Sequence, residues 1–255
     1  MDLLVNILLG VIVAATPLVF ASLGELITEK SGVLNLGVEG MMVMGAIAAF
    51  ATTIGTGSYL LGIVAAVVAG SAMAFLFGLL ALTFLANQVA SGLALTMFGL
   101  GVSALWGQGY SGRSIPAFPH VHIPVLSDLP VVGPLLFSLD LLVYLSFALT
   151  VGVWYFLNRT RQGLILRSIG ENHDAAHAIG YSVVGYRYLA VLAGGACAGL
   201  GGAYLSLVQT PFWVERMTAG RGWIALALVV FAAWRPARVL AGAYLFGGIT
   251  ILQLH

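Results

Sequence analysis

Long apolar segments decide what this chain can fold into. Tyr59–Leu85 contains no charged residue and exceeds the roughly 20 residues that a helix needs to cross a bilayer. The apolar runs along the chain are Leu3–Leu23, Val38–Thr56, Tyr59–Leu85, Ala90–Gly107, Leu135–Leu157, Tyr188–Val208, Trp223–Trp234 and Val239–Leu254. The sequence therefore predicts an all-α integral membrane protein, a polytopic helical bundle of about eight segments that forms one domain over residues 1–255.

Two of these runs have unusual lengths or ends. Trp223–Trp234 gives roughly 18 Å of helix against a hydrocarbon core of ~30 Å. We expect it to be a half-helix or a re-entrant segment, unless it gains length from Met217–Gly222. The last run stops inside an apolar stretch at His255, which favours a chain truncated at its C-terminus.

Composition excludes several other classes of protein. Only 7% of the residues are charged, against roughly 25% in soluble domains, and the net charge of +1 gives no reason to expect a nucleic-acid partner. Cys197 is the single cysteine, so neither an intrachain disulfide nor a thiolate metal cluster is possible. No Walker sequence and no Gly-x-Ser-x-Gly nucleophile turn is present. We therefore expect no ATP hydrolysis of the Walker type by this chain.

Basic residues predict the orientation in the membrane. The polar connection Asn158–Arg187 holds four arginines, and the positive-inside rule places it in the cytoplasm. Alternation then places the proline-rich connection Gln108–Pro134 outside. Seven of the ten basic residues fall inside, and the N-terminus falls outside, although a re-entrant segment would reverse that last assignment. The inside set is Lys30, Arg159, Arg161, Arg167, Arg187, Arg235 and Arg238, and the outside set is Arg113, Arg216 and Arg221.

The stretch "GELITEKSGVLNLGVEGMM" places charges and glycines between two apolar runs. Asn35 and Glu39 are four residues apart and share a face if this part is helical. Carboxylates at membrane depth usually face a cavity or a partner, and transporter sites often use broken helices. The stretch is either a broken helix that borders a translocation path or an interfacial turn whose charges lie in water.

Uncharged polar side chains form a second group of candidates. Asn87 and Gln88 interrupt an apolar region, and their amides offer both a donor and an acceptor for hydroxyls or bases. They serve equally well to hold helices together. Gln209 and Trp223 are further candidates for the substrate path, whereas the pair Gly195 and Gly199 is typical of close helix packing.

The histidines give a weak indication of a metal site. His173 and His177 have the spacing of two zinc ligands on a helix, but Asp174 stands where a zinc protease needs glutamate, and no third ligand is evident. A solvated cytoplasmic helix explains them better, and His120 and His122 are interpreted as loop residues. We predict no metal and no catalytic residue.

Three stretches resemble one transporter family. They are "GELITEKSGVLNLGVEGMMVMGA", "RSIGENHDAAHAIGYSVVGYRYLAVLAGGACAGLGGAYLSL" and "MTAGRGWIALALVVFAAWRPARVLAGAYLFGG". In this order they resemble permease subunits of bacterial ABC importers of the simple-sugar and nucleoside type, within the branched-chain amino acid and ribose permease superfamily, and the second is most similar to nucleoside permeases. Permeases for riboflavin or branched-chain amino acids are the alternatives within this group.

The resemblance implies a set of partners and a location. Two ATP-binding-cassette subunits bind the cytoplasmic side and hydrolyse ATP, a second permease subunit completes the pore, and an extracytoplasmic binding protein delivers the solute. The chain itself then needs no cofactor and lies among the lipids of the bacterial plasma (inner) membrane. Members of the family usually extend further, with one or two more helices.

The resemblance also implies a coupling helix in the loop 158–187. It should lie within Gly170–Gly180, where carboxylates suit a helix N-terminus and Gly180 suits a helix stop. Its small residues Ala175, Ala176 and Ala178 then seat in a groove of the ATPase. The residues that we assign to coupling are Glu171, Asn172, Asp174, Ala175, Ala178 and Gly180.

Three other functions compete with this interpretation. An ion-driven secondary transporter needs paired intramembrane acids, but Glu39 stands alone, and Asp128 and Asp140 belong in or near the outer loop. A membrane-bound enzyme built on the two-histidine helix and a non-catalytic assembly subunit are the other two.

Overall fold

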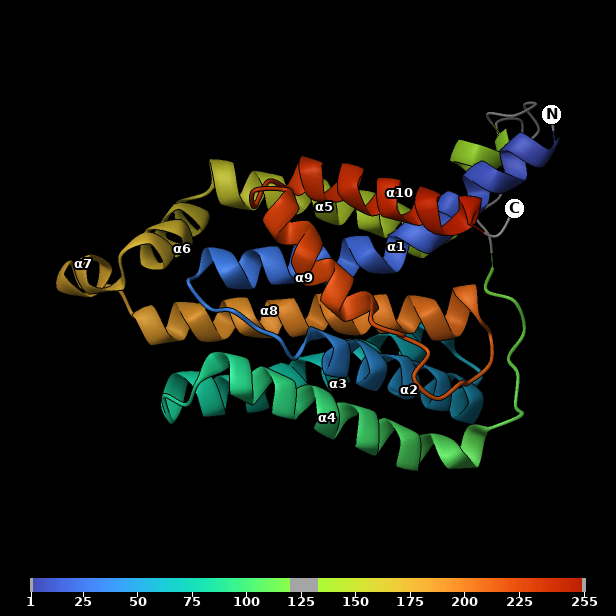
Figure 1. The fold of residues 1–255 in the computed structure, drawn as a ribbon, viewed down its shortest axis with the longest axis horizontal. Coiled ribbons are helices and arrows are strands. Elements are labelled where there is room, and N and C mark those ends of the chain that lie inside the picture. The colour runs from blue at the N-terminus through green and yellow to red at the C-terminus, as the bar shows by residue number, and fades with distance from the viewer. Residues whose placement is uncertain (1, 120–132, 254–255) are drawn as a thin grey trace.

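The computed structural model describes residues 2–119 and 133–253, which form a bundle of helices (Figure 1). Its α-helices are α1 (Asp2–Lys30), α2 (Val38–Thr56), α3 (Tyr59–Gly78), α4 (Gln88–Gly107), α5 (Leu141–Arg159), α6 (Arg161–Glu171), α7 (His173–Ala178), α8 (Val183–Tyr204), α9 (Arg221–Phe231) and α10 (Pro236–Leu252). Short π-helical turns extend α3 over Leu79–Thr83 (η1) and α8 over Leu205–Gln209 (η4), and a third (η3, Gly133–Phe137) precedes α5. A 3₁₀ turn, Gln108–Tyr110 (η2), follows α4.

Six of these helices are long and apolar enough to cross a membrane, namely α1, α2, α3, α4, α5 and α8 with their extensions. The helices α9 and α10 are apolar but shorter. This arrangement confirms the expected all-α bundle of about eight segments. The expected short segment is α9, which has 11 residues. It begins at Arg221, so of the stretch Met217–Gly222 only the last two residues belong to the helix.

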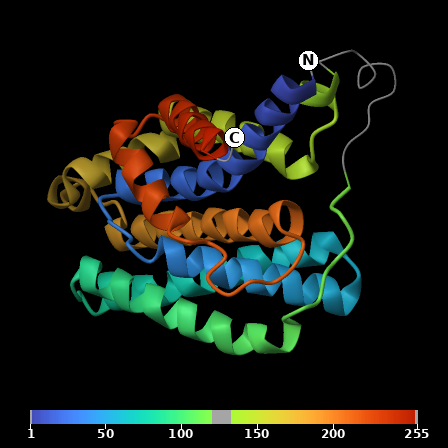
Figure 2. The same ribbon diagram turned by 45° about the vertical axis from the view of Figure 1, so that its right-hand side comes forward.

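Helix α8 lies at the centre of the bundle and packs against α1, α2 and α3 (Figures 1 and 2). Its glycines allow this close approach. A Cβ on Gly199 would lie 2.2 Å from the carbonyl oxygen of Ala66 in α3, and a Cβ on Gly45 of α2 would lie 2.5 Å from the Cα of Gly199. The prediction that Gly195 and Gly199 are packing glycines is confirmed, because Gly195 meets Gly70 of α3 in the same way.

The first helix is longer than the apolar run that predicted it. It continues beyond the predicted run Leu3–Leu23, through Gly24, and ends at Lys30. Gly24 remains helical because its missing side chain lets α1 lie directly against Gly194 of α8. The chain leaves the helix only at Ser31, where a turn with Gly32 at a φ of +82° begins a non-helical segment.

The connection assigned to the cytoplasm forms a projection at one end of the bundle. Asn158 and Arg159 still belong to α5, and Arg187 already belongs to α8, so the connection is shorter than predicted and consists mainly of α6 and α7. The start of α1 and the end of α10 lie at the opposite end of the bundle (Figure 1). With α6 and α7 in the cytoplasm, α1 therefore begins outside, as the basic residues predict.

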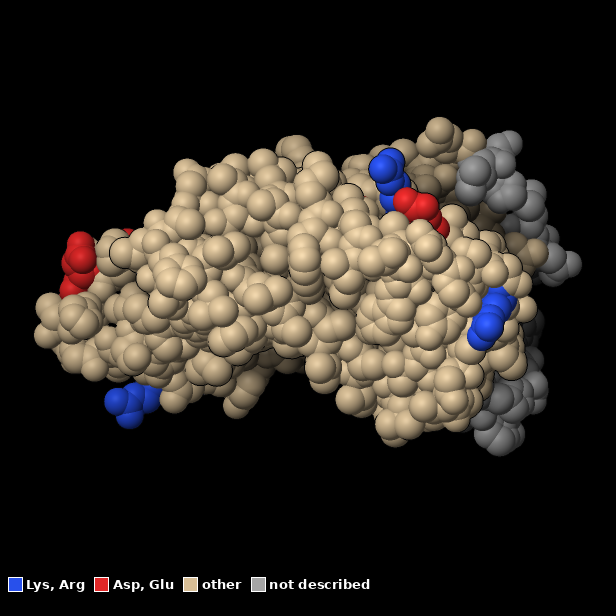
Figure 3. Space-filling model, turned by 90° about the horizontal axis from the view of Figure 1, so that it is seen from below, with Lys and Arg blue, Asp and Glu red and all other residues tan. Residues whose placement is uncertain are grey.

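Charged side chains are distributed as expected for a membrane-embedded body. On the face shown in Figure 3, they lie toward the two ends of the molecule, with a long uncharged stretch between them. The loop histidines His120 and His122, together with Asp128, lie outside the residues that the structure describes.

Candidate functional site

Two non-helical segments enter the bundle from opposite ends and meet inside it. Residues 31–37 lead from the end of α1, which lies at the predicted cytoplasmic side, back to the start of α2. Residues 210–220 lead from the opposite end of the bundle, where α8 ends, to the start of α9 (Figure 1). In both ribbon views α9 slants from α10 toward the beginning of α2 (Figure 2). We call these stretches the inner segment (31–37) and the outer segment (210–220).

Glu39, in the first turn of α2, joins the two segments. Its Oε1 accepts hydrogen bonds from Thr218 Oγ1 at 2.5 Å and from the Gly220 backbone N–H at 2.9 Å. Its Oε2 accepts one from the Gly222 N–H at 2.7 Å, and the side chain is only 4% exposed. A carboxylate is the natural partner for the free N–H groups and positive dipole end at a helix N-terminus, so Glu39 caps α9 from a different helix.

Glycine and backbone strain shape the outer segment around this carboxylate. A Cβ on Gly222 would lie 2.5 Å from the Cα of Glu39, so only glycine lets α9 begin there. Gly220 has a φ of +84°, and the non-glycine residues Arg216 and Ala219 also have positive φ values, of 58° and 45°. Such left-handed conformations persist only where surrounding contacts hold them.

The inner segment is held by buried polar groups. Asn35 is fully buried, but it lies in this segment and not in a helix, so the expectation that it shares a helical face with Glu39 is wrong. Its Oδ1 accepts a hydrogen bond from the Gly37 N–H at 2.9 Å, and its own backbone N–H donates to Glu25 Oε1 at 3.0 Å. Asn35 therefore shapes the chain that precedes α2.

Asn87 and Gln88 lie at the start of α4, where Asn87 is the N-cap and Gln88 the first helical residue, at the same end of the bundle as the start of α8. Thr83, just before the turn that leads to α4, contacts the Tyr188 hydroxyl of α8 at 2.5 Å. Asn87 caps α4 by accepting a hydrogen bond from the Ala90 N–H at 3.0 Å, and Gln88 Oε1 accepts one from the Leu34 N–H at 2.9 Å. Asn87 is exposed and Gln88 is half-buried, and Gln88 holds the inner segment directly.

Gln209 and Trp223 lie on either side of the outer segment. Gln209 ends η4, and its Oε1 is buried without a hydrogen-bond partner within the described chain. Trp223 is half-buried in the first turn of α9, next to the residue that binds Glu39. Of the six residues predicted for a substrate path, all lie in or beside the two segments, yet only Asn35 and Glu39 are buried.

Sequence reasoning missed several residues that build this site. Thr218, Gly220 and Gly222 carry no distinguishing pattern, because their common feature is a contact with a side chain 179 to 183 positions away. The sequence shows Glu25 as a carboxylate in an apolar region, but it does not predict that the side chain is buried. It is 1% exposed inside α1.

The projecting connection contains the short helix that the family resemblance implied. Helix α7 has Asn172 as its N-cap, where the side chain accepts a hydrogen bond from the Ala175 N–H at 3.0 Å. Asp174 lies in its first turn, and Gly180 follows it with a φ of +90°. Glu171, however, is the last residue of α6 and not part of the α7 start.

Only part of the predicted small-residue face of α7 is free. Ala175 and Ala178 are exposed, whereas Ala176 is 2% exposed because it packs against Ile165 and Ile169 of α6. Of the three predicted alanines, Ala175 and Ala178 are therefore available on the surface of α7, and Ala176 holds the two short helices together.

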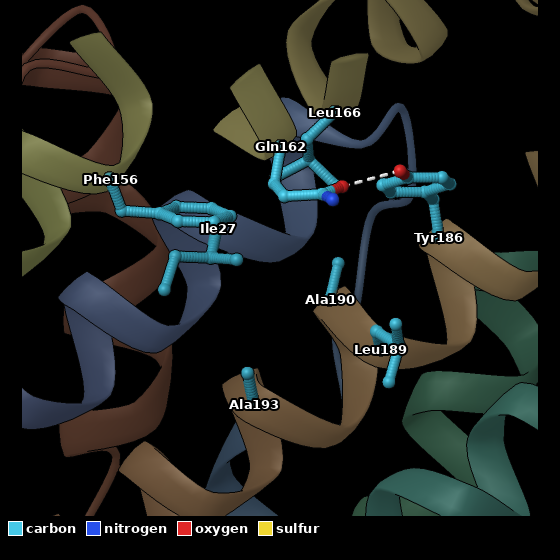
Figure 4. A pocket seen from close by; sticks show the side chains of 8 residues that line it. All are labelled: Ile27, Phe156, Gln162, Leu166, Tyr186, Leu189, Ala190 and Ala193. Carbon is cyan, nitrogen blue, oxygen red and sulfur yellow. Dashed lines mark hydrogen bonds between the residues drawn. The ribbon is translucent and has the colours of Figure 1, made fainter. Parts of the chain in front are cut away.

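An apolar cavity of about 420 Å³ lies where α6 rests on the bundle (Figure 4). Leu166 and Gln162 of α6 cover it from above, and Ala190 and Ala193 of α8 form its floor. One side-chain hydrogen bond, between Gln162 Oε1 and the Tyr186 hydroxyl, ties α6 to α8 across the cavity. The projection formed by α6 and α7 is thus attached to the bundle above a space that side chains leave unfilled.

Comparison with known proteins identifies the family. Residues 7–254 match the family described as the permease component of branched-chain amino acid transport systems. The chain belongs to this permease family. The permease is 45% identical to the putative glucose ABC transporter permease protein TsgC13 of Haloferax volcanii, over the whole of its own length and 79% of the relative's. No solved structure matches it.

Two further relatives are named for nucleosides. The permease is 35% identical to the guanosine ABC transporter permease protein NupQ of Bacillus subtilis, over 92% of its length and 78% of the relative's. It is 32% identical to the nucleoside ABC transporter permease protein NupC of Lactococcus lactis, over 97% and 82%. This permease is therefore a transport subunit of the plasma membrane, of a class that works with ATP-binding subunits and a substrate-binding protein.

Proposed function

We propose that this permease forms part of the membrane channel of an ABC importer and admits a nucleoside or a simple sugar to the cytoplasm. Identity of 45%, 35% and 32% to permeases named for glucose, guanosine and nucleosides supports this substrate class. These solutes share several hydroxyl groups, which hydrogen-bond readily to amides and carboxylates. The observation that carries the proposal is the match of residues 7–254 to a family of transport permeases. The projecting helices α6 and α7 of this chain support it.

In this proposal, two cytoplasmic ATPase subunits bind and hydrolyse ATP and thereby supply the energy for solute import. The permease itself does not bind ATP. The exposed face of α7, with Ala175 and Ala178, is the part that seats in the ATPase. A second permease subunit completes the channel, and a binding protein delivers the solute from outside.

The substrate path is proposed to follow the face where the inner and outer segments lie. Non-helical backbone is tolerated at membrane depth only where protein covers it or where it lines a water-filled cavity. Leu34 is 41% exposed and Phe212 is 45% exposed, so neither segment is fully covered by this chain. Glu215 and Arg216 of the outer segment are also exposed. Water in the path, or the second permease, therefore contacts this face.

Transport by the reconstituted importer tests the proposal. The permease is placed in proteoliposomes with its ATPase, second permease and binding protein, and uptake of radiolabelled guanosine, glucose and leucine is measured with and without ATP. We expect ATP-dependent uptake of guanosine or glucose and none of leucine. Uptake by the permease alone under a proton gradient, without nucleotide, would refute the proposal.

One matched pair of variants tests the role of α7. Ala178→Arg places a long charged side chain on the exposed face and should reduce co-purification of the ATPase, whereas Ala178→Ser keeps the residue small and should not. Equal ATPase recovery with both variants would show that α7 is not the docking element.

A further inference from the structure

A basic hollow of about 590 Å³ opens at the cytoplasmic end of the bundle, apart from the two segments that meet at Glu39. Lys30 at the end of α1, Arg167 of α6 and Arg235 just before α10 all line it. It is distinct from the apolar cavity of Figure 4, which lies between α6 and α8. Cations from three separate parts of the chain therefore converge on one space.

None of these three cations forms an ion pair with a carboxylate of the described residues. Among the residues that the structure describes, the one pairing of a basic group with a carboxylate within 4.0 Å is His173 with Asp174, which is elsewhere. Arg167 Nε is buried and has no hydrogen-bond partner there. Two acids, Glu29 and Glu171, line a smaller adjoining space with Lys30 and Arg167, and Glu29 Oε2 accepts a hydrogen bond from the Trp234 Nε1. Arg167 is half-buried, and a buried guanidinium nitrogen without a partner is unfavourable, so the hollow is suited to an incoming anion.

Two tryptophans form the rim of the hollow. Trp154 and Trp234 line it and are 43% and 37% exposed. Each carries a cation near its ring, with Arg159 at 5.9 Å from the Trp154 centroid and Lys30 Nζ at 5.9 Å from that of Trp234. Tryptophan rings prefer the level of lipid headgroups. The rim therefore marks the depth at which the bilayer surface meets the protein.

The start of α10 adds to the attraction for anions. Pro236 and Ala237, the first residues of this helix, also line the hollow, so the positive end of the helix dipole faces it. The preceding residues Ala233 and Trp234 both have positive φ values, of 50° and 52°, which turn the chain sharply between α9 and α10. This turn brings Trp234 and Arg235 to the same side of the hollow.

We propose that the basic hollow binds the phosphate of an anionic phospholipid in the cytoplasmic leaflet. Anionic lipids are enriched in that leaflet, and basic pockets at the ends of membrane helices are suited to their headgroups. Free phosphate offers the same oxyanion chemistry. The lipid is the favoured source because the tryptophan rim and the helix ends place the hollow at the membrane surface.

Lipid retention by the purified importer tests this site. The complex is exchanged into mixtures of dioleoyl-phosphatidylglycerol and dioleoyl-phosphatidylcholine, and bound lipids are counted by native mass spectrometry. We expect preferential retention of phosphatidylglycerol. The double variant Arg167→Gln and Arg235→Gln should weaken this retention by about 25-fold, at about fivefold for each cation removed.

The control is the double variant Arg113→Gln and Arg216→Gln, which removes the same charge from residues outside the hollow and should leave retention unchanged. If the first double variant does not fold, Arg235→Gln alone should still weaken retention about fivefold, because Arg235 is exposed and not needed for packing. Equal retention of both lipids, or equal loss in the control, would overturn the proposal. Thermal stabilisation by inorganic phosphate without any preference for phosphatidylglycerol would show that the source is free phosphate and overturn the lipid assignment.

Discussion

Replacement of Glu39 by alanine should destabilise the permease strongly. The carboxylate accepts three hydrogen bonds, and hydrogen bonds to a charged group contribute about 1.5–3 kcal/mol each. Its position at the α9 N-terminus adds about 0.3–1 kcal/mol. Because these contributions share one side chain and do not simply add, we expect a loss of about 4 kcal/mol in the free energy of unfolding. For a chain of this size, that corresponds to a fall of roughly 8–16 °C in Tm.

The assay is thermal unfolding of the purified permease in detergent, followed by uptake in the reconstituted importer. Glu39→Gln should have an intermediate effect, because one amide oxygen can still accept the bonds from Thr218 and Gly220 while the amide nitrogen faces the Gly222 N–H. Thr218→Val removes one donor and should lower Tm by roughly 4–8 °C, from about 2 kcal/mol. A Tm for Glu39→Ala within about 4 °C of the unaltered protein would refute this reasoning. Full stability of Glu39→Gln with altered solute selectivity would instead indicate direct contact with the solute.

Four other substitutions test the packing and the cytoplasmic end. Gly199→Ala forces a Cβ into the backbone of α3 and should lower the free energy of unfolding by about 3 kcal/mol, whereas Gly152→Ala, with open space around it, should raise it by up to about 1 kcal/mol; thermal unfolding measures both. Ala193→Leu partly fills the apolar cavity and should stabilise the attachment of α6 by about 1 kcal/mol while lowering maximal ATP-driven uptake; faster uptake would contradict this. Asn87→Ala removes the α4 cap and should lower Tm by roughly 2–4 °C, from about 1 kcal/mol, and unchanged Tm would show that the cap is dispensable.

The membrane helices were predictable because their sequences are continuous apolar runs. The shortness of α9 followed from the same rule, since its apolar run is too short to span the bilayer. The end of α1 was not predictable in this way. Gly24 and Glu25 interrupt the apolar pattern, yet the helix continues, because Gly194 lies against the glycine and the Asn35 N–H reaches the carboxylate.

The candidate site was only partly predictable for a related reason. The sequence indicates that Glu39 is unusual, since a carboxylate at the start of an apolar helix needs a partner. It does not identify that partner, because Thr218 and Gly222 approach through the fold and not through any local spacing. Likewise, the alanines of α7 looked equivalent in sequence, and only the packing of α6 distinguishes Ala176 from its neighbours.

The meeting of α2 and α9 at Glu39 has a mechanical consequence. In the predicted orientation, α2 runs from Glu39 toward the outside and α9 runs from it toward the cytoplasm. Together they form one discontinuous helical element built from two segments that are distant in the sequence. A continuous helix resists bending along its whole length, whereas α2 and α9 are joined through the Glu39 carboxylate and the close backbone contact at Gly222, with no peptide chain running directly between them. A displacement of α9 is therefore not transmitted rigidly to α2. In a transport channel, this would allow the cytoplasmic and outer openings to open at different times.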